Sequence, residues 1–85
     1  NYVPNEIVYN TESNAIELIS SDTISGKVIV ATYNDNRLIN ANIYEAKQTI
    51  NNVTIDKTNA ITAKIFWWDS LNGLVPKCTA LELSL

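Results

Sequence analysis

Apolar and polar residues alternate in several short segments of the chain. Between Glu12 and Ser20, Ile16 and Leu18 fall on one side of an extended backbone and Glu17 falls on the other. Successive side chains of a β-strand point to opposite faces, so a period of two is typical of a strand with one face in the core. The alternation therefore predicts a half-buried strand in this segment.

The clearest local signal predicts a β-hairpin. An apolar run over residues 27–33 leads into an Asn-Asp-Asn turn at 34–36, and a second run follows over 37–46. Asn and Asp tolerate the left-handed backbone conformation that short hairpin loops need. The outgoing arm is apolar on both faces, which favours a central strand. On the returning arm we expect the apolar set to face the core: Ile39, Ala41 and Ile43.

A second strong alternation runs from Ile61 to Trp68 and contains two adjacent tryptophans. One face is entirely apolar and is expected in the core: Ile61, Ala63, Ile65 and Trp67. The opposite face carries Thr62, Lys64, Phe66 and Trp68. Because neighbouring side chains diverge, Trp67 is predicted to fill the gap between two sheets while Trp68 meets a different environment.

Three weaker segments complete the pattern. Residues 49–56 predict a strand with Val53 and Ile55 inward, and a turn follows over residues 57–59. The first ten residues can supply an edge strand, because Pro4 cannot donate a hydrogen bond to a sheet. Residues 77–85 predict a closing strand with Thr79, Leu81, Leu83 and Leu85 inward and Cys78, Ala80, Glu82 and Ser84 outward.

About seven short strands separated by turns predict an all-β protein, built as an antiparallel β-sandwich of two sheets. Of the 85 residues, 25 are Ile, Val or Thr, whose β-branched side chains favour pleated surfaces. The length suits a single domain over residues 1–85. Methionine is absent even at position 1, which indicates a module cut from a longer protein.

The sequence lacks the residues on which most catalytic and metal sites depend. It contains no His, and its single cysteine, Cys78, has no basic cluster beside it to activate the thiol. The spacing of the nine carboxylates singles out no catalytic pair. Asp35 and Asp69 are candidate calcium ligands, but hydrogen bonds to turn backbone are favoured for both. We therefore predict a protein that is not an enzyme and needs no cofactor.

Charge and hydropathy restrict the expected partners. The net charge is −3, and the six basic residues are scattered, so no cationic stripe is available for nucleic acid. No apolar run approaches the roughly 20 residues that a membrane helix needs, and membrane insertion is not expected.

The aromatic residues are the remaining candidates for binding. Phe66 and Trp68, two apart on one strand face, can present rings to a polysaccharide, and Tyr33 and Tyr44 can widen that platform. The alternative is that both rings pack beneath the following loop or a neighbouring strand and add buried area to a thin domain. The second interpretation is favoured for Trp68.

Three stretches carry a resemblance to a known class of modules. They are the hairpin with Ala31 and Tyr33, the turn with Phe66, Trp68 and Asp69 followed by Pro76, and the closing residues 78–85. They are similar to an immunoglobulin-like or fibronectin-III-like module of secreted or surface proteins of clostridia and related bacteria, often beside carbohydrate-active domains. The likeness covers roughly residues 23 to 85, and Trp67 departs from it because such modules usually place an aliphatic residue there.

The resemblance implies an extracellular, non-catalytic accessory module. The first hypothesis is a spacer, anchor or stabiliser whose partners are neighbouring domains of the same polypeptide. The second is a carbohydrate-binding module that uses the exposed aromatic residues. The third is a pilus or adhesin subunit whose edge accepts a partner strand, which a complete set of strands would disfavour.

Overall fold

A computed structural model describes residues 4–85, and these residues form seven strands and no helix. The strands are β1 (Glu6–Asn10), β2 (Ala15–Ile19), β3 (Lys27–Asn34), β4 (Arg37–Glu45), β5 (Thr49–Ile50), β6 (Thr62–Trp68) and β7 (Leu81–Ser84). The described part of the chain accordingly contains no helix that is long and apolar enough to cross a lipid bilayer.

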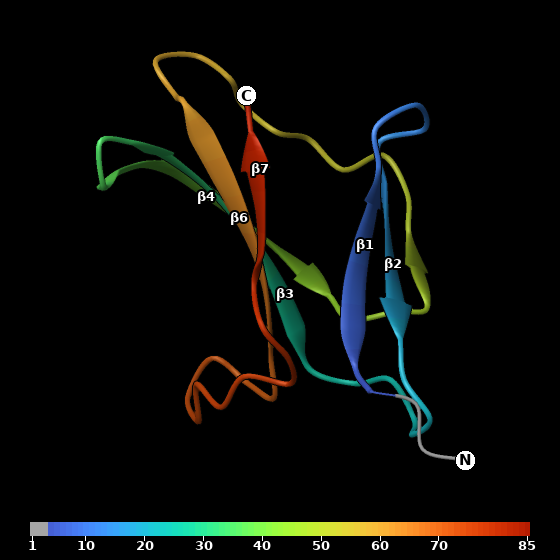
Figure 1. Cartoon of the computed structure of the whole chain (residues 1–85). Coiled ribbons are helices and arrows are strands. Elements are labelled where there is room, and N and C mark those ends of the chain that lie inside the picture. Colours follow the sequence, from blue (N-terminus) through green and yellow to red (C-terminus); the bar gives the residue numbers. More distant parts are fainter. Residues whose placement is uncertain (1–3) are drawn as a thin grey trace.

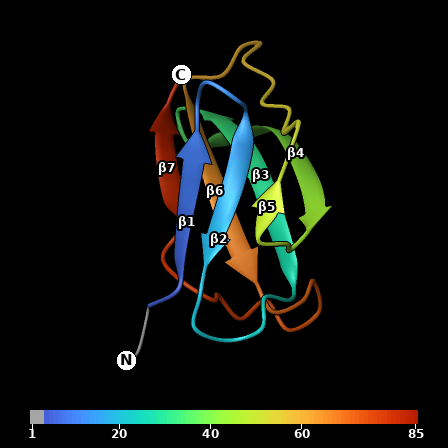
Figure 2. The ribbon, with the colours of Figure 1, turned by 90° about the vertical axis from the view of Figure 1, so that its right-hand side faces the viewer.

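The strands form two antiparallel sheets that face each other (Figure 1). One sheet has the order β1-β2-β5, and the other has the order β4-β3-β6-β7. Figure 2 shows the smaller sheet lying in front of the larger one. The predicted all-β, antiparallel sandwich of about seven strands in two sheets is therefore confirmed. The predicted edge position of the first strand and central position of the 27–33 strand are also confirmed, since β1 borders its sheet and β3 lies between β4 and β6.

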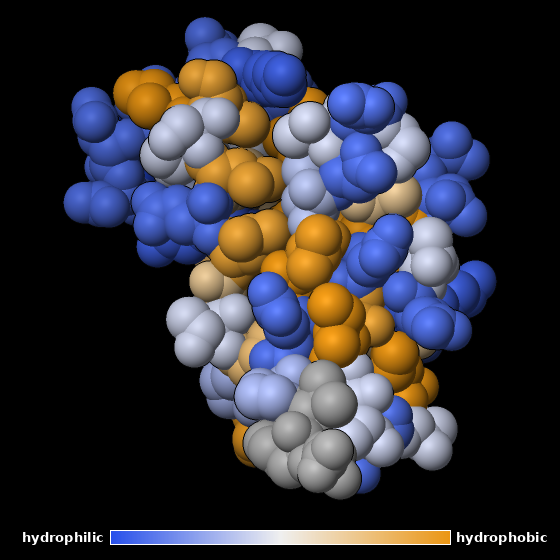
Figure 3. Space-filling view, turned by 45° about the vertical axis from the view of Figure 1, so that its right-hand side comes forward, coloured by the Kyte–Doolittle hydropathy of each residue, from blue (hydrophilic) through white to orange (hydrophobic). Residues whose placement is uncertain are grey.

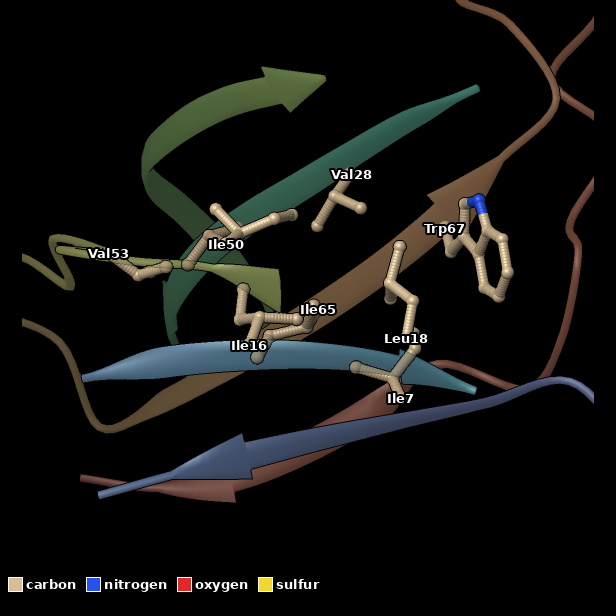
Figure 4. Packing of buried hydrophobic residues seen from close by; sticks show 9 residues of the cluster. Ile7, Ile16, Leu18, Val28, Ile50, Val53, Ile65 and Trp67 are labelled. Atoms are coloured by element: carbon tan, nitrogen blue, oxygen red, sulfur yellow. The ribbon is translucent and has the colours of Figure 1, made fainter. Parts of the chain in front are cut away.

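The core lies between the two sheets, and its buried members come from five of the seven strands and from the loop after β5 (Figure 4). Its buried members are Ile7, Ile16, Leu18, Val28, Val30, Ile50, Val53, Ile65 and Trp67. Trp67 is 1% exposed, and its indole N–H donates to the carbonyl oxygen of Ser25 at 2.8 Å. The predicted core positions of Ile16, Leu18 and Trp67 are confirmed.

The predicted hairpin is confirmed as β3 and β4, joined by Asp35 and Asn36. Both turn residues adopt positive φ values, 49° and 68°, which Asp and Asn tolerate better than most residues. This conformation is typical of two-residue hairpin loops.

The predicted orientation of β4 was wrong. Ile39, Ala41 and Ile43 were expected in the core, but all three are exposed, and Ile43 is 55% exposed. Because directly opposite residues of paired strands share a face, the register of Ile43 with Ile29 places both on the outer face of the sheet.

The inner positions of β4 meet a polar backbone, which explains this orientation. The side-chain amide of Asn42 donates to the Thr54 carbonyl oxygen, and the Thr54 N–H donates to the Tyr44 hydroxyl oxygen at 3.1 Å. Tyr44 also packs against the core with its ring. Polar side chains that form hydrogen bonds with this backbone are thus favoured on the inner face of β4. The local alternation alone had predicted the aliphatic residues on that face.

Three further predictions needed correction. Within the 49–56 segment only Thr49–Ile50 is a strand, although Val53 is buried and the turn at 57–59 is present. Ile61 is 51% exposed because it precedes β6 at the end of the sandwich. Cys78 was predicted outward but packs against the core, since β7 begins only at Leu81 and the preceding residues are not extended.

Of the predicted closing strand, Leu81 and Leu83 pack against the core, whereas Thr79 and Leu85 are exposed. The border between β1 and β7 is one side of the sandwich, and there the Asn5 side-chain amide donates to the Lys77 carbonyl oxygen at 2.9 Å. Figure 3 shows hydrophobic residues through the middle of this side of the molecule, with hydrophilic groups around them. The two sheets are thus held here by side chains rather than by strand pairing.

Candidate interaction surface

Phe66 and Trp68 lie side by side on the outer face of the four-stranded sheet. In the register of β3 with β6, Phe66 is opposite Ile29 and Trp68 is opposite Lys27. The two ring centroids are 5.4 Å apart, and the ring planes are inclined by 40°. Both side chains are half-buried. They therefore form a tilted aromatic pair and not one flat platform.

A shallow hollow of about 590 Å³ adjoins this pair. It lies between the end of β6 and the segment that returns toward β7, and its other lining residues include Leu74, Pro76, Thr79 and Ala80. The hollow exists because β6 pairs with β7 only as far as Ile65, beyond which Trp68 is bridged to Pro76. The apolar surface beside the two rings is thus built by the 69–80 segment.

The turn after β6 is held by hydrogen bonds of Asp69 and Ser70. Asp69 accepts the Val75 N–H on its carboxylate at 2.9 Å and donates its own N–H to the Val75 carbonyl oxygen at 2.9 Å. The Ser70 hydroxyl accepts the Gly73 N–H at 2.7 Å. The predicted turn-bonding role of Asp69 is therefore confirmed, and Ser70 adds a second such bond.

This turn presents apolar side chains to solvent. Leu71 is 44% exposed, Leu74 is 53% exposed and Val75 is 55% exposed. Leu74 has a φ of 55°, a conformation that is uncommon for a bulky residue. The sequence analysis missed these residues, although Leu and Val inside a segment rich in Asn, Gly and Pro were the available signal.

We define the outer apolar surface as Ile43, Phe66, Trp68, Leu74 and Pro76. Ile43 comes from β4, the two rings come from β6, and the last two residues come from the following turn. Ile29 lies between Ile43 and Phe66 in the sheet and is itself buried. The surface therefore spans three adjacent strands and the turn.

The two predicted tyrosines do not join the aromatic pair. Tyr33 is on the same outer face but lies four residues along β3 from Ile29, or about 13 Å. Its ring instead lies 5.4 Å from the Lys64 ammonium group. Tyr44 is on the opposite, inner face of the sheet. The structure thus brings together two of the four candidate residues, Phe66 and Trp68.

Two other carboxylates, Asp35 and Asp56, lie in or beside turns. Asp35 is exposed in the hairpin turn, and the Asp56 carboxylate accepts the Thr58 N–H at 2.9 Å, which lowers the pKa of Asp56. Among residues 4–85 no three side chains of His, Cys, Asp or Glu are grouped as metal ligands would be.

Partial burial changes the chemistry of the Cys78 thiol. Desolvation, with a smaller contribution from the negative charge of Glu6, raises the pKa of Cys78 above its ordinary value. Because the thiolate is the reactive form, we expect iodoacetamide to alkylate native Cys78 several times more slowly at pH 8 than Cys78 of the urea-unfolded chain. The two rates should converge as the pH rises above the native pKa. Equal rates at pH 8 would contradict this expectation.

Comparison of the chain with models of known protein families, with curated proteins and with solved structures found no match.

Proposed function

We propose that this chain is a non-catalytic interaction module of an exported bacterial surface or carbohydrate-active protein, in which it spaces, anchors or stabilises neighbouring domains. The observation that carries the proposal is the outer apolar surface. Exposed contiguous apolar side chains on a soluble domain usually mark a contact with another molecule or domain. Contacts between domains of one chain are typically moderate in area and contain both polar and apolar groups.

The arrangement of the surface supports docking onto another protein surface. Phe66 and Trp68 are half-buried and already packed on each other, whereas Ile43 and Leu74 project more fully, with 55% and 53% of their surface exposed. The Asp69 and Ser70 hydrogen bonds hold the turn, so ordering it on contact costs little conformational entropy. A neighbouring domain would thus bury side chains that are held in place beforehand.

The test compares the module alone with the module inside its natural polypeptide. We expect the free energy of unfolding of the module to be higher in the natural polypeptide by about 1–3 kcal/mol, because the outer apolar surface is then buried. Two substitutions remove apolar surface at little cost to the isolated module: Leu74→Asn, which suits a positive φ, and Ile43→Thr, which keeps a β-branched side chain.

Each substitution should lower the unfolding free energy of the isolated module by less than about 1 kcal/mol and abolish most of the gain in the natural polypeptide. The control is Val8→Thr, which removes an aliphatic residue that is 37% exposed on the other sheet. Equal stability of the module alone and within the polypeptide would refute the proposal.

Carbohydrate binding by Phe66 and Trp68 is the second candidate. It is favoured by the aromatic pair beside a hollow of about 590 Å³. The 40° inclination between the rings weakens it, because a sugar ring can stack flat on only one of them. The test is titration of the isolated module with soluble glycans and co-sedimentation with insoluble ones. If the docking proposal is correct, no binding that depends on Trp68 should be seen. Binding that Trp68→Ala abolishes would favour the second candidate.

A further inference from the structure

The edge strand β4 is long and carries no charge along most of its length. It has nine residues, whereas the other strands at sheet borders, β1, β5 and β7, have five, two and four. Between Arg37 and Glu45 lie seven residues without a charge or a proline. Natural edge strands are usually shortened, charged or interrupted by proline, because their unpaired backbone groups invite another strand. β4 lacks these three safeguards.

The backbone of β4 offers hydrogen-bonding groups at this border. The Ala46 N–H donates to the Gly26 carbonyl oxygen at 3.0 Å, so the backbone of Ala46 faces β3. Neighbouring residues of a strand direct their backbone groups to opposite sides. Ala41, Ile43 and Glu45 therefore direct theirs away from β3, and Figure 2 shows β4 at the border of the sandwich with no strand beyond it.

The sequence of β4 is symmetric about Ala41. Residues 39–43 read Ile-Asn-Ala-Asn-Ile, the same in both directions. In an antiparallel pair of identical strands centred on Ala41, Ile39 lies opposite Ile43, and Asn40 lies opposite Asn42. Matched side chains at facing positions stabilise strand pairing.

We propose that β4 pairs with β4 of a second copy of this chain, antiparallel and about a two-fold axis at Ala41. The pairing joins the two four-stranded sheets into one continuous sheet. It also brings the outer faces of both copies to the same side, so the two outer apolar surfaces become neighbours. In this two-fold arrangement the β4 border of each copy is paired, so none is left for a third copy. Association through β4 therefore stops at a dimer.

One irregularity limits the contact. The register of β3 with β4 shifts beside Ile39, which leaves an extra residue at the hairpin end of β4. Beyond the shift Leu38 lies opposite Tyr33 on the outer face, so Arg37 lies on the inner face and the regular part of the border is confined to residues 40–45. The interface is therefore short, and a weak, reversible dimer is expected.

The test is the oligomeric state of the chain, measured by sedimentation over about 10 μM to 1 mM. Ala41→Pro removes an N–H that points away from β3 and should weaken dimerisation by at least about tenfold. The matched control is Ser84→Pro on the other border of the same sheet. Since the Leu85 N–H donates to the Ile61 carbonyl oxygen, the Ser84 N–H points away from β6, and this variant should dimerise as the parent chain does.

Amide hydrogen exchange gives a second test that does not depend on proline. In the dimer, amide hydrogen exchange at Ala41 and Ile43 should slow relative to dilute protein.

A monomer at all concentrations would overturn the proposal. So would open-ended association, a dimer that Ala41→Pro leaves intact, or amide exchange at Ala41 and Ile43 that does not slow in the dimer.

Discussion

Substitution of Gly26 by alanine is expected to lower the free energy of unfolding by about 3 kcal/mol or more, or to prevent folding. Gly26 has a φ of 105°, where residues with a Cβ are strained. A Cβ at this position would also overlap the Trp68 carbonyl oxygen and lie 3.2 Å from that of Asp69. Both obstacles are backbone atoms, so relief requires the start of β3 to move away from the end of β6.

The experiment is urea unfolding followed by tryptophan fluorescence, with Gly73→Ala as the control. A Cβ at Gly73 would meet only side-chain oxygens of Asp69 and Ser70, the nearest at 2.8 Å, and its φ is not in the left-handed region. Side chains can rotate away, so the loss of unfolding free energy should be about 1 kcal/mol. A loss at Gly26 as small as that at Gly73 would mean that the β3 and β6 backbones do not approach closely there.

Such a close approach could not be predicted from the sequence, whereas the identity of most strands could. In β2 and β6 the inner face is covered along its length by the opposite sheet, so the local alternation and the true burial agree. Ile16, Leu18 and Ile65 are therefore buried where the alternation predicts. The hairpin turn was equally predictable, because the φ values of Asp35 and Asn36 suit those two residue types.

The face of β4 was not predictable, because it depends on a distant segment. The inner side of β4 meets the backbone around Thr54, which follows β5 on the opposite sheet. The Thr54 carbonyl oxygen accepts a hydrogen bond from Asn42, and the Thr54 N–H donates one to Tyr44. The sequence of β4 itself does not indicate that its polar residues have hydrogen-bonding partners on the inner face. The same reversal exposes Ile43 and so creates part of the outer apolar surface.

For a related reason, the face on which the aromatic pair lies could be predicted, but its exposure could not. Strand alternation places Phe66 and Trp68 on one face, and the structure does so. Whether a half-exposed ring is covered depends on the return of the chain from Leu74 to Ala80, which leaves a hollow instead of a lid. Turn residues alone predict that the chain bends at Asp69 but not how far it bends over the sheet.

Trp67→Ala is expected to lower the free energy of unfolding by about 3–5 kcal/mol. The indole is 1% exposed and lies among Leu18, Val28 and Ile65 in the core, so its removal leaves a large cavity between the sheets. The substitution also deprives the Ser25 carbonyl oxygen of its hydrogen bond from the indole N–H. Because small domains have only about 5–10 kcal/mol to lose, the variant should be marginally folded at 25 °C.

Two comparisons separate the causes of this loss. Trp67→Phe keeps a ring in the core but removes the N–H that donates to the Ser25 carbonyl oxygen. If that hydrogen bond contributes to folding, the free energy of unfolding should fall by about 1–2 kcal/mol. Trp68→Ala removes the same residue type one position along, from the outer face, where the side chain is half-buried beside Phe66. Its loss should be about 1–2 kcal/mol, since fewer neighbours lose contact. Equal losses at Trp67 and Trp68 would mean that the outer face is packed as completely as the core, and a surface so packed would have no apolar area left to offer a neighbouring domain.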